Sequence, residues 1–522
     1  MNKNIFALWI TVLFFGLSSF ECSKKSSTPP PGEIQASSYS PNVPVLRGMV
    51  SNPVVRVVVS IPAGNAEQHY RKLQCTLNAG AVNEIEKVDA YLTGAEPFST
   101  TNLIGSVNPS ATSFDIPVTI NQRSGIVFIW LSIVLKPTAT LNNNIELHCI
   151  KLIDEAGKEL FVKQDSSNYT KRTGVAIRKA GDEGVNTYRI PGIATTDRGT
   201  LLSVYDIRYN NAKDLPENID VGLSRSTDGG ATWEPMKVIM DMGAPHENNG
   251  IGDPAILFDP VTKKIWVAAL WSKGNRSIAG SLPGLSPDTT GQFVLVSSAD
   301  DGVNWSDPYT ITPQVKNPAW RLFFNGPGSG IAMQDGKLVF AAQYWDENRM
   351  PFSTIIYSDD HGSSWKGKIA GPKSNTTESQ VVETSAGTLM LNMRDNRGSF
   401  RSVATTNNLG TSWTEHSTSY NTLADPVCMG SLIKAKVKVK GVMKEVLFFS
   451  NPNTSSGRYN ITIKASLDFG NTWLPANQLL IDERQCYGYS SLTKVDDNTI
   501  GILYEGIKDL YFVNVKVNDI IK

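Results

Sequence analysis

Short apolar runs of β-branched residues, interrupted by polar turn residues, recur along most of the chain. Between residues 45 and 165 they include 54–61, 126–135 and 145–153, and Gly, Asn, Pro and Ser separate them. No stretch in this region has a helical period of useful length. Short strands with frequent turns are typical of a β-sandwich, so we expect an all-β domain over 45–165.

The C-terminal two thirds of the chain repeat one short pattern, Ser-x-Asp-x-Gly-x-x-Trp, with a degenerate fourth copy. The copies begin 72, 60, 48 and 60 residues apart, at Ser226, Ser298, Ser358, Thr406 and Ser466. Repetition at this spacing indicates units that must stack on their neighbours to bury a core. Dividing the 353 residues of 170–522 by the mean interval of 60 predicts a six-bladed β-propeller.

The chemistry of the repeat is that of a turn. Ser and Asp side chains bond backbone amides in tight turns, Gly supplies a positive φ, and Trp packs the turn against the next unit. The repeated carboxylates therefore have a structural role, and we do not consider them candidates for acid/base catalysis. These are Asp228, Asp300, Asp360 and Asp468.

Composition limits the classes of partner and cofactor. The 522 residues carry 49 basic and 49 acidic side chains, so the overall charge attracts neither nucleic acid nor an anionic membrane. Any anionic ligand must be held by local arginines. Only five histidines occur, without metal-ligand spacing to Cys or carboxylates, so we expect no metal and no cofactor. We expect a monomer.

The N-terminus predicts export. An apolar run over 5–17 follows Lys3, which is typical of a signal peptide over 1–22. Cys22, followed by a Ser/Pro-rich linker over 23–44, suggests a lipid anchor, with soluble secretion as the alternative. We therefore expect a periplasmic, cell-surface or secreted protein. The other four cysteines are even in number and could form one bridge per domain, but free buried thiols are favoured.

Several polar residues within strand-like surroundings are not explained by the repeats. Arg189 begins the tripeptide Arg-Ile-Pro, and Glu378 lies in Thr-Glu-Ser-Gln, 16 residues before Arg394. The complete set is Arg189, Arg208, Asp214, Asp253, Glu378, Arg394, Arg458, Tyr489 and Glu505. Each has an ordinary structural alternative, such as a strand end, a turn before proline or a core tyrosine. Their joint occurrence in this order favours a functional interpretation.

These motifs and their order resemble the bacterial exo-α-sialidases that carry Arg-Ile-Pro and Asp-box motifs. The resemblance extends over 175–522, and the 45–161 region is similar, less specifically, to the β-sandwich on some of these enzymes. It implies a six-bladed catalytic propeller over 170–522 that acts on sialylated glycans. The sandwich would bind carbohydrate or act as a spacer.

The resemblance implies that Arg189, Arg394 and Arg458 grip the substrate carboxylate. A guanidinium is always charged and forms bidentate bonds with a carboxylate, so three of them can select an anionic sugar. Three convergent cations repel one another and need a counter-charge. Glu505 resembles the family glutamate that orients the Arg-Ile-Pro arginine.

The nucleophile implied by the resemblance is Tyr489, with Glu378 as its base. The anomeric carbon of a sialoside bears a carboxylate, which would repel a carboxylate nucleophile, whereas a phenol is neutral. Sialidases are among the glycosidases that use a tyrosine nucleophile. Asp214 would protonate the leaving oxygen and then activate water, so two inversions would give net retention.

Arg208 and Asp253 would contact the ring substituents of the sugar. Trp271, Trp320 and Trp345 could line the pocket or pack in the blades. One alternative is a trans-sialidase, including an intramolecular one, because it shares every catalytic residue. Another is a non-catalytic propeller that binds sialic acid, although such a protein has no need for Tyr489, Glu378 and Asp214 together.

Overall fold

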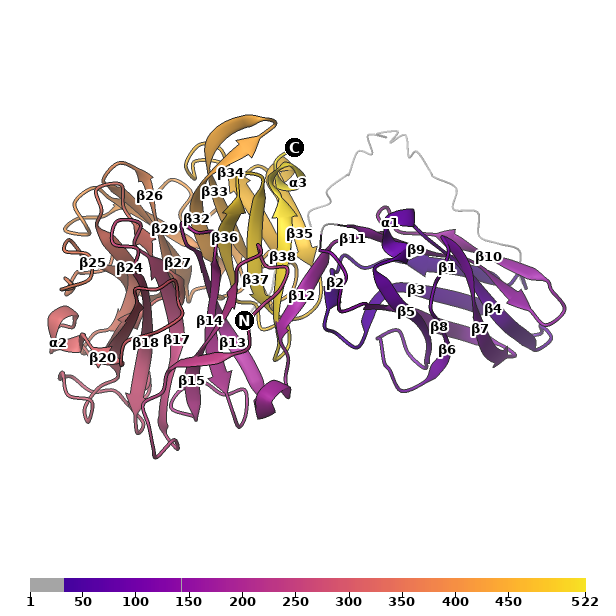
Figure 1. The fold of residues 1–522 in the computed structure, drawn as a ribbon, viewed down its shortest axis with the longest axis horizontal. Helices are drawn as coiled ribbons and strands as arrows, with labels where there is room; N and C mark the ends of the chain where they lie inside the picture. The colour runs from indigo at the N-terminus through magenta and orange to yellow at the C-terminus, as the bar shows by residue number, and fades with distance from the viewer. Residues whose placement is uncertain (1–31, 142) are drawn as a thin grey trace, which may run out of the picture.

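The computed structural model describes residues 32–141 and 143–522, which form two β-sheet units joined in one chain (Figure 1). The signal peptide predicted over 1–22, the lipid anchor at Cys22 and residues 23–31 of the expected linker lie outside the described residues. The all-β prediction is confirmed, because strands make up both units and helices are limited to single turns. Along the described residues no helix is long and apolar enough to cross a membrane.

The N-terminal unit is a strongly curved sheet that wraps around its own core. Its strand order is β6-β5-β8-β3-β1-β10-β9-β4-β7, with β11 paired to β9. The outer strands β6 and β7 contact each other, and a Cβ at Gly105 of β6 would lie 2.2 Å from the Pro117 carbonyl oxygen. The elements are β1 (Gln35–Tyr39), β3 (Asn52–Ile61), β4 (Gln68–Leu77), α1 (Ala79–Val82), β5 (Ile85–Thr93), β6 (Leu103–Val107), β7 (Ser113–Gln122), β8 (Gly125–Leu135), β9 (Ile145–Asp154), β10 (Glu159–Gln164) and β11 (Thr170–Lys171).

The structure differs from the expected linker over 23–44 and from the expected start of the sandwich at residue 45. Residues Gln35–Tyr39, expected in the linker, form β1 between β3 and β10 in the middle of the sandwich sheet. Val45–Arg47 forms β2, which pairs with β12 of the propeller rather than with the sandwich. The Ser-rich composition of this segment predicted a linker rather than a strand. Its alternate residues Ala36 and Ser38 are nevertheless buried.

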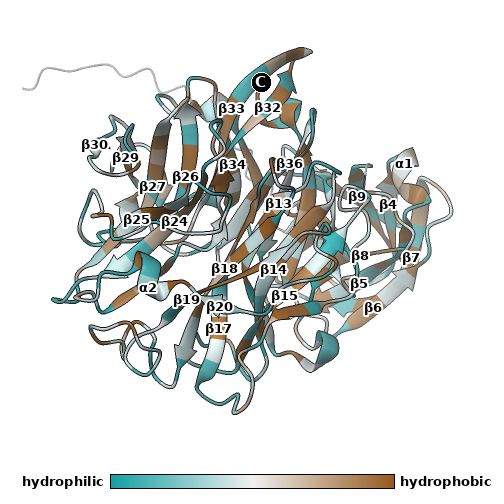
Figure 2. Cartoon of the chain, turned by 60° about the vertical axis from the view of Figure 1, so that its left-hand side comes forward, coloured by the Kyte–Doolittle hydropathy of each residue, from teal (hydrophilic) through white to brown (hydrophobic). Residues whose placement is uncertain are grey.

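The C-terminal unit is a six-bladed propeller, as predicted from the repeat. Hydrophobic residues (brown in Figure 2) lie mainly on the strands, while the connecting loops are more polar. Five blades are built from strands close in sequence, although β22 of the second blade lies between β21 and β23 of the third. Their strands are β13 (Thr187–Thr195), β14 (Leu201–Arg208), β15 (Ile219–Ser226) and β16 (Lys237–Met240); β17 (Asn249–Phe258), β18 (Ile265–Lys273), β19 (Gln292–Ser298), β20 (Tyr309–Thr310) and β22 (Gly328–Ser329); β21 (Leu322–Asn325), β23 (Ile331–Ala332), β24 (Leu338–Trp345) and β25 (Pro351–Ser358); β26 (Thr376–Ser385), β27 (Thr388–Asp395), β29 (Ser402–Thr406) and β30 (Thr414–Glu415), with β28 (Ser399–Phe400) and β31 (Ala424–Asp425) beside them; and β32 (Ser431–Val439), β33 (Val442–Pro452), β34 (Ile461–Ser466) and β35 (Gln478–Asp482).

The sixth blade closes the ring with strands from both ends of the propeller sequence. Strands β36 (Ser490–Asp496), β37 (Thr499–Glu505) and β38 (Leu510–Lys516) pair in order, and β12 (Thr173–Arg178) adds to β38. The hydrogen bonds between β12 and β38 tie the segment that precedes the first blade to the last strand of the chain. Single helical turns lie at η1 (Asp182–Gly184), α2 (Thr312–Val315), η2 (Pro475–Asn477) and α3 (Val517–Ile520).

The repeated boxes are turns that begin at the end of the third long strand of a blade. In the first box, Ser226 Oγ accepts the Gly230 N–H at 2.9 Å, and Asp228 Oδ1 accepts the Thr232 N–H at 2.8 Å. Trp233 packs edge-to-face on Phe512 of the neighbouring blade, with ring centroids 5.2 Å apart. The boxes therefore join blades, as the turn chemistry predicts.

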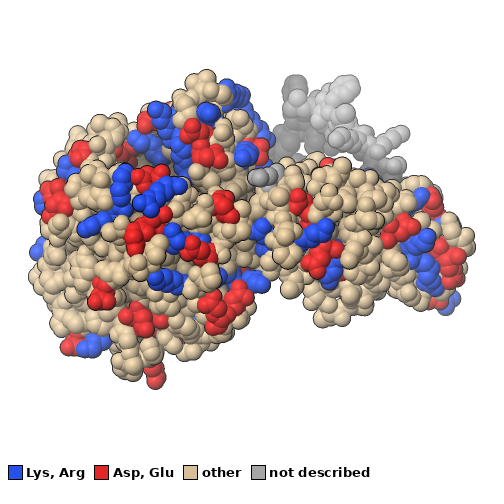
Figure 3. Space-filling model, in the orientation of Figure 1, with Lys and Arg blue, Asp and Glu red and all other residues tan. Residues whose placement is uncertain are grey.

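The charged surface residues do not gather by sign on the face in view. Figure 3 shows basic and acidic side chains interspersed over both units. This distribution agrees with the balanced composition and leaves selection of an anionic ligand to a local site.

Candidate active site

A cavity of about 510 Å³ contains most of the residues expected to act together. Strands from several blades and the loops between them supply its wall, as the convergence of propeller loops predicts. Seven of the nine predicted site residues line it: Arg189, Asp214, Asp253, Glu378, Arg394, Arg458 and Tyr489. Arg208 and Glu505 lie behind this wall.

Arg189 is aimed by a distortion of β13. The register of β13 with β14 shifts between Arg189 and Gly192, and Ile190 has a φ of 57°, which is rare for a β-branched residue. Glu505, completely buried on β37, accepts the Arg189 Nε–H at 3.0 Å and the Ile190 N–H at 2.9 Å. The same carboxylate accepts the Tyr489 N–H at 2.9 Å. Glu505 thus fixes the arginine and the tyrosine backbone together.

Arg394 and Glu378 face each other from adjacent strands. Glu378 lies on β26 where its register with β27 shifts, between Thr376 and Ser379. Arg394 NH1, on β27, lies 2.5 Å from Glu378 Oε2 and donates to the Tyr489 hydroxyl at 3.0 Å. Both side chains are mostly shielded, at 20% and 13% exposed, so their charges interact strongly.

Arg458 completes a group of three guanidinium groups around Tyr489. Its NH1 donates to the Tyr487 carbonyl at 2.8 Å and its NH2 to the Val427 carbonyl at 3.1 Å. The guanidinium carbons of Arg458 and Arg189 lie 5.7 and 5.2 Å from the centre of the Tyr489 ring. The propeller therefore brings together three cations that are far apart in sequence.

Tyr489 is buried with its hydroxyl against a carboxylate. Its Oη donates to Glu378 Oε1 at 2.5 Å, while its ring packs with Ile190, Cys428 and Met429. Burial, together with the negative charge of Glu378, raises the pKa of Tyr489 well above its usual value. The proton accordingly resides on the phenol, beside a group that can accept it.

Asp214 lies at the open side of the cavity, with its side chain 78% exposed. Its Oδ1 accepts Arg208 NH1 at 2.6 Å and is 3.4 Å from Arg189 NH1. Desolvation within the pocket acts to raise the pKa of Asp214, but the two guanidinium groups outweigh it and hold that pKa below its usual value.

The structure differs from the expectation for Arg208, which was predicted to contact the sugar. Its side chain is 1% exposed and is not part of the cavity wall. The guanidinium of Arg208 donates to other protein groups instead. Asp206 Oδ2 accepts its Nε–H at 3.1 Å and its NH2 at 2.9 Å. Its NH1 donates to the Ala212 carbonyl and to Asp214. Arg208 therefore positions Asp214.

Asp206 is a residue of the site that the sequence reasoning missed. It is completely buried and bonds both Arg208 and, through Oδ1, the Asp253 N–H at 2.8 Å. A Cβ at position 252 would lie 2.9 Å from Asp206 Oδ1, so Gly252 permits this approach. The signal was available, because residues two apart on a strand face the same side.

Asp253 lines the cavity on a bulge of β17, with a φ of 59°. Its carbonyl accepts the Asn325 amide at 2.6 Å. Burial, with the nearby carboxylates of Asp206 and Glu378, raises the pKa of Asp253 well above its usual value. When protonated, the Asp253 carboxyl can donate a hydrogen bond into the cavity.

Apolar side chains also line the cavity. Leu270, Ile278, Phe324 and Trp345 line it, with the buried amide of Gln343 among them. Trp345 thus lines the pocket, whereas Trp320 stacks on Tyr344 with centroids 3.8 Å apart. Among the described residues, no group of three or more His, Cys, Asp and Glu side chains could hold a metal ion.

The fold and the cavity define a six-bladed β-propeller with a pocket that holds three arginines, three carboxyl groups and a tyrosine. A family model described as BNR repeat-like domain matches residues 190–499. A sialidase of Bacteroides fragilis (strain YCH46) is 48% identical over 76% of this chain and 74% of its own. A sialidase of Micromonospora viridifaciens is 32% identical over 69% of this chain and 55% of its own. The solved structure of the Hadza microbial sialidase Hz136 is similar with a TM-score of 0.86 and 38% identity, covering 93% of this chain and all of that one.

The chain belongs to the sialidase family. It is a glycoside hydrolase of the exo-sialidase type, and the sequence resemblance to bacterial sialidases with a propeller is thereby confirmed.

Proposed function

We propose that this protein is a retaining exo-α-sialidase that hydrolyses terminal sialic acid from glycoproteins, glycolipids and oligosaccharides through a tyrosyl-linked intermediate. The observation that carries the proposal is the contact of the Tyr489 hydroxyl with Glu378 and Arg394 inside a pocket that also holds Arg189 and Arg458.

Arg189, Arg394 and Arg458 bind the carboxylate of the sugar in this proposal. Each guanidinium is oriented by another group, namely Glu505, Glu378 and two backbone carbonyls. Preorganised donors lose less side-chain entropy on binding than free ones do. A neutral sugar brings no further counter-charge to the three cations, whereas a carboxylate does, which supports selection of an anionic substrate.

Tyr489 is the nucleophile and Glu378 its base. As Oη bonds to the anomeric carbon, its proton passes to Glu378 Oε1, and the bond to the leaving oxygen breaks. Arg394, 3.0 Å from Oη, stabilises the negative charge that develops on the phenol. The high pKa of the free phenol supports a concerted proton transfer, because a free phenolate would be costly in this pocket.

Asp214 is the general acid and then the base that activates water. Its low pKa in the free protein results from Arg208 and Arg189. When a substrate carboxylate pairs with Arg189, that cation is partly neutralised, and the pKa of Asp214 rises towards the range in which it can donate a proton. Water then attacks the anomeric carbon, Asp214 takes its proton, and Tyr489 leaves with the proton held by Glu378.

The test compares wild type, Tyr489→Phe and Tyr504→Phe on a chromogenic sialoside. Tyr504 is a matched control, because its buried phenol also bonds a carboxylate, Asp482, at 3.0 Å, but lies outside the cavity. We expect Tyr489→Phe to lose hydrolysis and Tyr504→Phe to keep it. In wild type, incubation with 2,3-difluorosialic acid should add the mass of the reagent less one hydrogen fluoride to the peptide that contains Tyr489, because the fluoride at the anomeric carbon leaves as the Tyr489 oxygen bonds.

Product analysis separates hydrolysis from transfer. Release of free sialic acid with the α-anomer formed first supports a retaining hydrolase. An anhydro sugar or a new sialoside would identify a trans-sialidase on the same residues, and binding without turnover by wild type would identify a sialic-acid-binding propeller. Labelling at a residue other than Tyr489 would contradict the proposed intermediate.

A further inference from the structure

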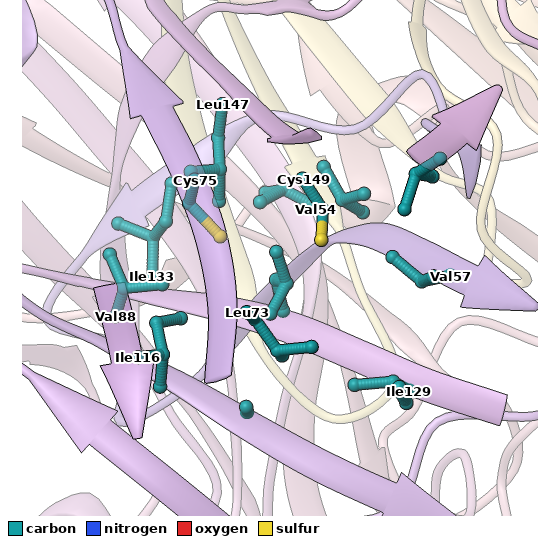
Figure 4. Packing of buried hydrophobic residues seen from close by; sticks show 14 of the residues in the cluster. Val54, Val57, Leu73, Cys75, Val88, Ile116, Ile129, Ile133, Leu147 and Cys149 are labelled. Carbon is teal, nitrogen blue, oxygen red and sulfur yellow. The ribbon is translucent and has the colours of Figure 1, made fainter. Parts of the chain in front are cut away.

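Two of the four cysteines in the described residues lie opposite each other in the sandwich. Cys75 on β4 and Cys149 on β9 are register partners in an antiparallel pair. Both are completely buried, and Figure 4 shows their sulfur atoms pointing into the same cluster of apolar side chains. In the structure all four described cysteines are free thiols. The mechanism proposed above makes no use of Cys75 or Cys149.

The backbone hydrogen bonds show which kind of antiparallel pair the two cysteines form. The Asn78 N–H donates to the Glu146 carbonyl at 3.2 Å, so that pair is hydrogen-bonded. Because hydrogen-bonded and non-hydrogen-bonded pairs alternate along an antiparallel ladder, the pair three residues away, Cys75 with Cys149, is non-hydrogen-bonded.

Two further contacts agree with this assignment. The Leu77 N–H turns away from β9 and donates to the Thr112 carbonyl at 2.8 Å. The Cys149 carbonyl turns away from β4 and accepts the Gln164 side-chain amide at 2.9 Å. In a non-hydrogen-bonded pair the Cα atoms lie about 4.5 Å apart and the side chains approach most closely. Disulfides span Cα separations of roughly 4.4–6.8 Å, so no strand movement is needed.

We propose that Cys75 and Cys149 form a cross-strand disulfide when the chain folds in the presence of a disulfide oxidant. The raised pKa of the Cys75 thiol, caused first by the adjacent Cys149 thiol and then by burial, agrees with this proximity. The inference does not depend on the proposed catalytic residues, because the pair lies in the other unit of the chain.

The oxidation is a pair of thiol–disulfide exchanges. One cysteine thiolate attacks a sulfur of an external disulfide such as oxidised glutathione, releasing one molecule of reduced glutathione and leaving a mixed disulfide. The second thiolate displaces the second glutathione, and the Cys75–Cys149 bond forms. The two cysteines lose two protons and two electrons, which the two released glutathione molecules carry. Because both sulfurs are buried, the exchange occurs before the core closes.

Cys428 and Cys486 serve as an internal control. Both are buried in the propeller, but each lies in a loop and they belong to different apolar clusters. Burial alone therefore predicts the same redox state for all four cysteines. Register geometry predicts oxidation of Cys75 and Cys149 only.

The experiment refolds the full chain from denaturant with oxidised glutathione. The protein is then denatured again, free thiols are blocked with N-ethylmaleimide, and the sample is reduced and labelled with iodoacetamide. We expect iodoacetamide on Cys75 and Cys149, and N-ethylmaleimide on Cys428 and Cys486. A digest without reduction should contain the Cys75 and Cys149 peptides joined, lighter by about 2 Da than their sum.

A variant tests the pairing without depending on activity. In Cys75→Val the buried volume is nearly kept, and Cys149 should now carry N-ethylmaleimide. Reduction should lower the midpoint of thermal unfolding of the sandwich in wild type and leave that of Cys75→Val unchanged. N-ethylmaleimide on Cys75 and Cys149 in refolded wild type would overturn the proposal. So would iodoacetamide on Cys149 in the variant, because it would show a different partner.

Discussion

Replacing Asp206 with asparagine removes the anion that holds Arg208 while almost preserving the shape of the side chain. Asp206 accepts two bonds from Arg208 and one from the Asp253 N–H. The side-chain oxygen of an asparagine can accept hydrogen bonds from only one of these two partners. Its NH2 group then faces the N–H donors of the other partner and cannot accept from them. Breaking a buried ion pair costs about 3–5 kcal/mol, and because Arg208 keeps Asp214, we expect a loss of about 3 kcal/mol in unfolding free energy.

The same substitution should change the pH dependence of hydrolysis. Burial raises the pKa of Asp206 to about 6, so its charge is present above that pH. There Asp206 and Asp214 flank one guanidinium, and their charges, on the order of 8 Å apart, repel by about 2 kcal/mol at an effective dielectric of about 20. Removing Asp206 lowers the pKa of Asp214. Since the Asp214 side chain is 78% exposed, solvent weakens the effect, and we expect about one pKa unit or less. A general acid that deprotonates at lower pH moves the high-pH limb of kcat, which reports the enzyme–substrate complex, to lower pH.

Asp482→Asn is the matched control for this prediction. Asp482 is also buried and also bonds the arginine two residues later, Arg484, but neither residue lines the cavity. Urea unfolding should show a comparable loss for both variants, whereas only Asp206→Asn should shift the pH profile. If the profiles of both variants match wild type, or if both shift equally, Asp206 does not act through Asp214.

Two other substitutions separate binding from folding. Both contacts of Arg394, to Glu378 and to Tyr489, come from NH1, and the nitrogen of Arg394→Lys ends one bond short of that position. A hydrogen bond to a charged group contributes about 1.5–3 kcal/mol, so steady-state kinetics should show kcat/KM reduced by about 10- to 100-fold, and an unchanged value would contradict the assigned contacts. Asp300→Asn should lower stability at neutral pH without affecting kcat. The bonds of Asn304 and Ser298 lower the pKa of Asp300 to about 2, so its contribution is complete above about pH 4 and disappears as the pH falls towards 2. Urea unfolding at pH 7 and near pH 2 checks this, and an equal difference at both pH values would argue against the role of the carboxylate.

Much of the fold could be predicted from the sequence because the residues that form its turns are close together in the chain. The box residues form their turns within eight positions, and their spacing gave the number of blades. Strand β1 was missed for the same reason, because its polar sequence Gln35–Tyr39 becomes a strand only by pairing with β3 and β10. Local composition cannot report a partner such as β10, which lies more than 100 residues away.

The candidate site was only partly accessible from the sequence. Residue types and order identified the three arginines, the tyrosine and the carboxylates as a set. The sequence did not show that Arg208 is buried and supports Asp214, or that Asp206 joins Arg208 to the backbone of Asp253. Those roles depend on which face of β14 packs against β17, since the same guanidinium could equally have faced the cavity.

The amino-acid sequence by itself determined the β-architecture, the repeat and the chemical identity of the groups available for catalysis, because turns, alternation and side-chain charge are properties of short segments. The tertiary structure alone decided which of those groups meet. Ring closure by β12 on β38 brings strands from both ends of the propeller together, and Glu505 then contacts Arg189 across 316 residues of chain. A carboxylate and a guanidinium interact strongly and shift each other's pKa only when they share a buried space. That space exists only in the folded ring.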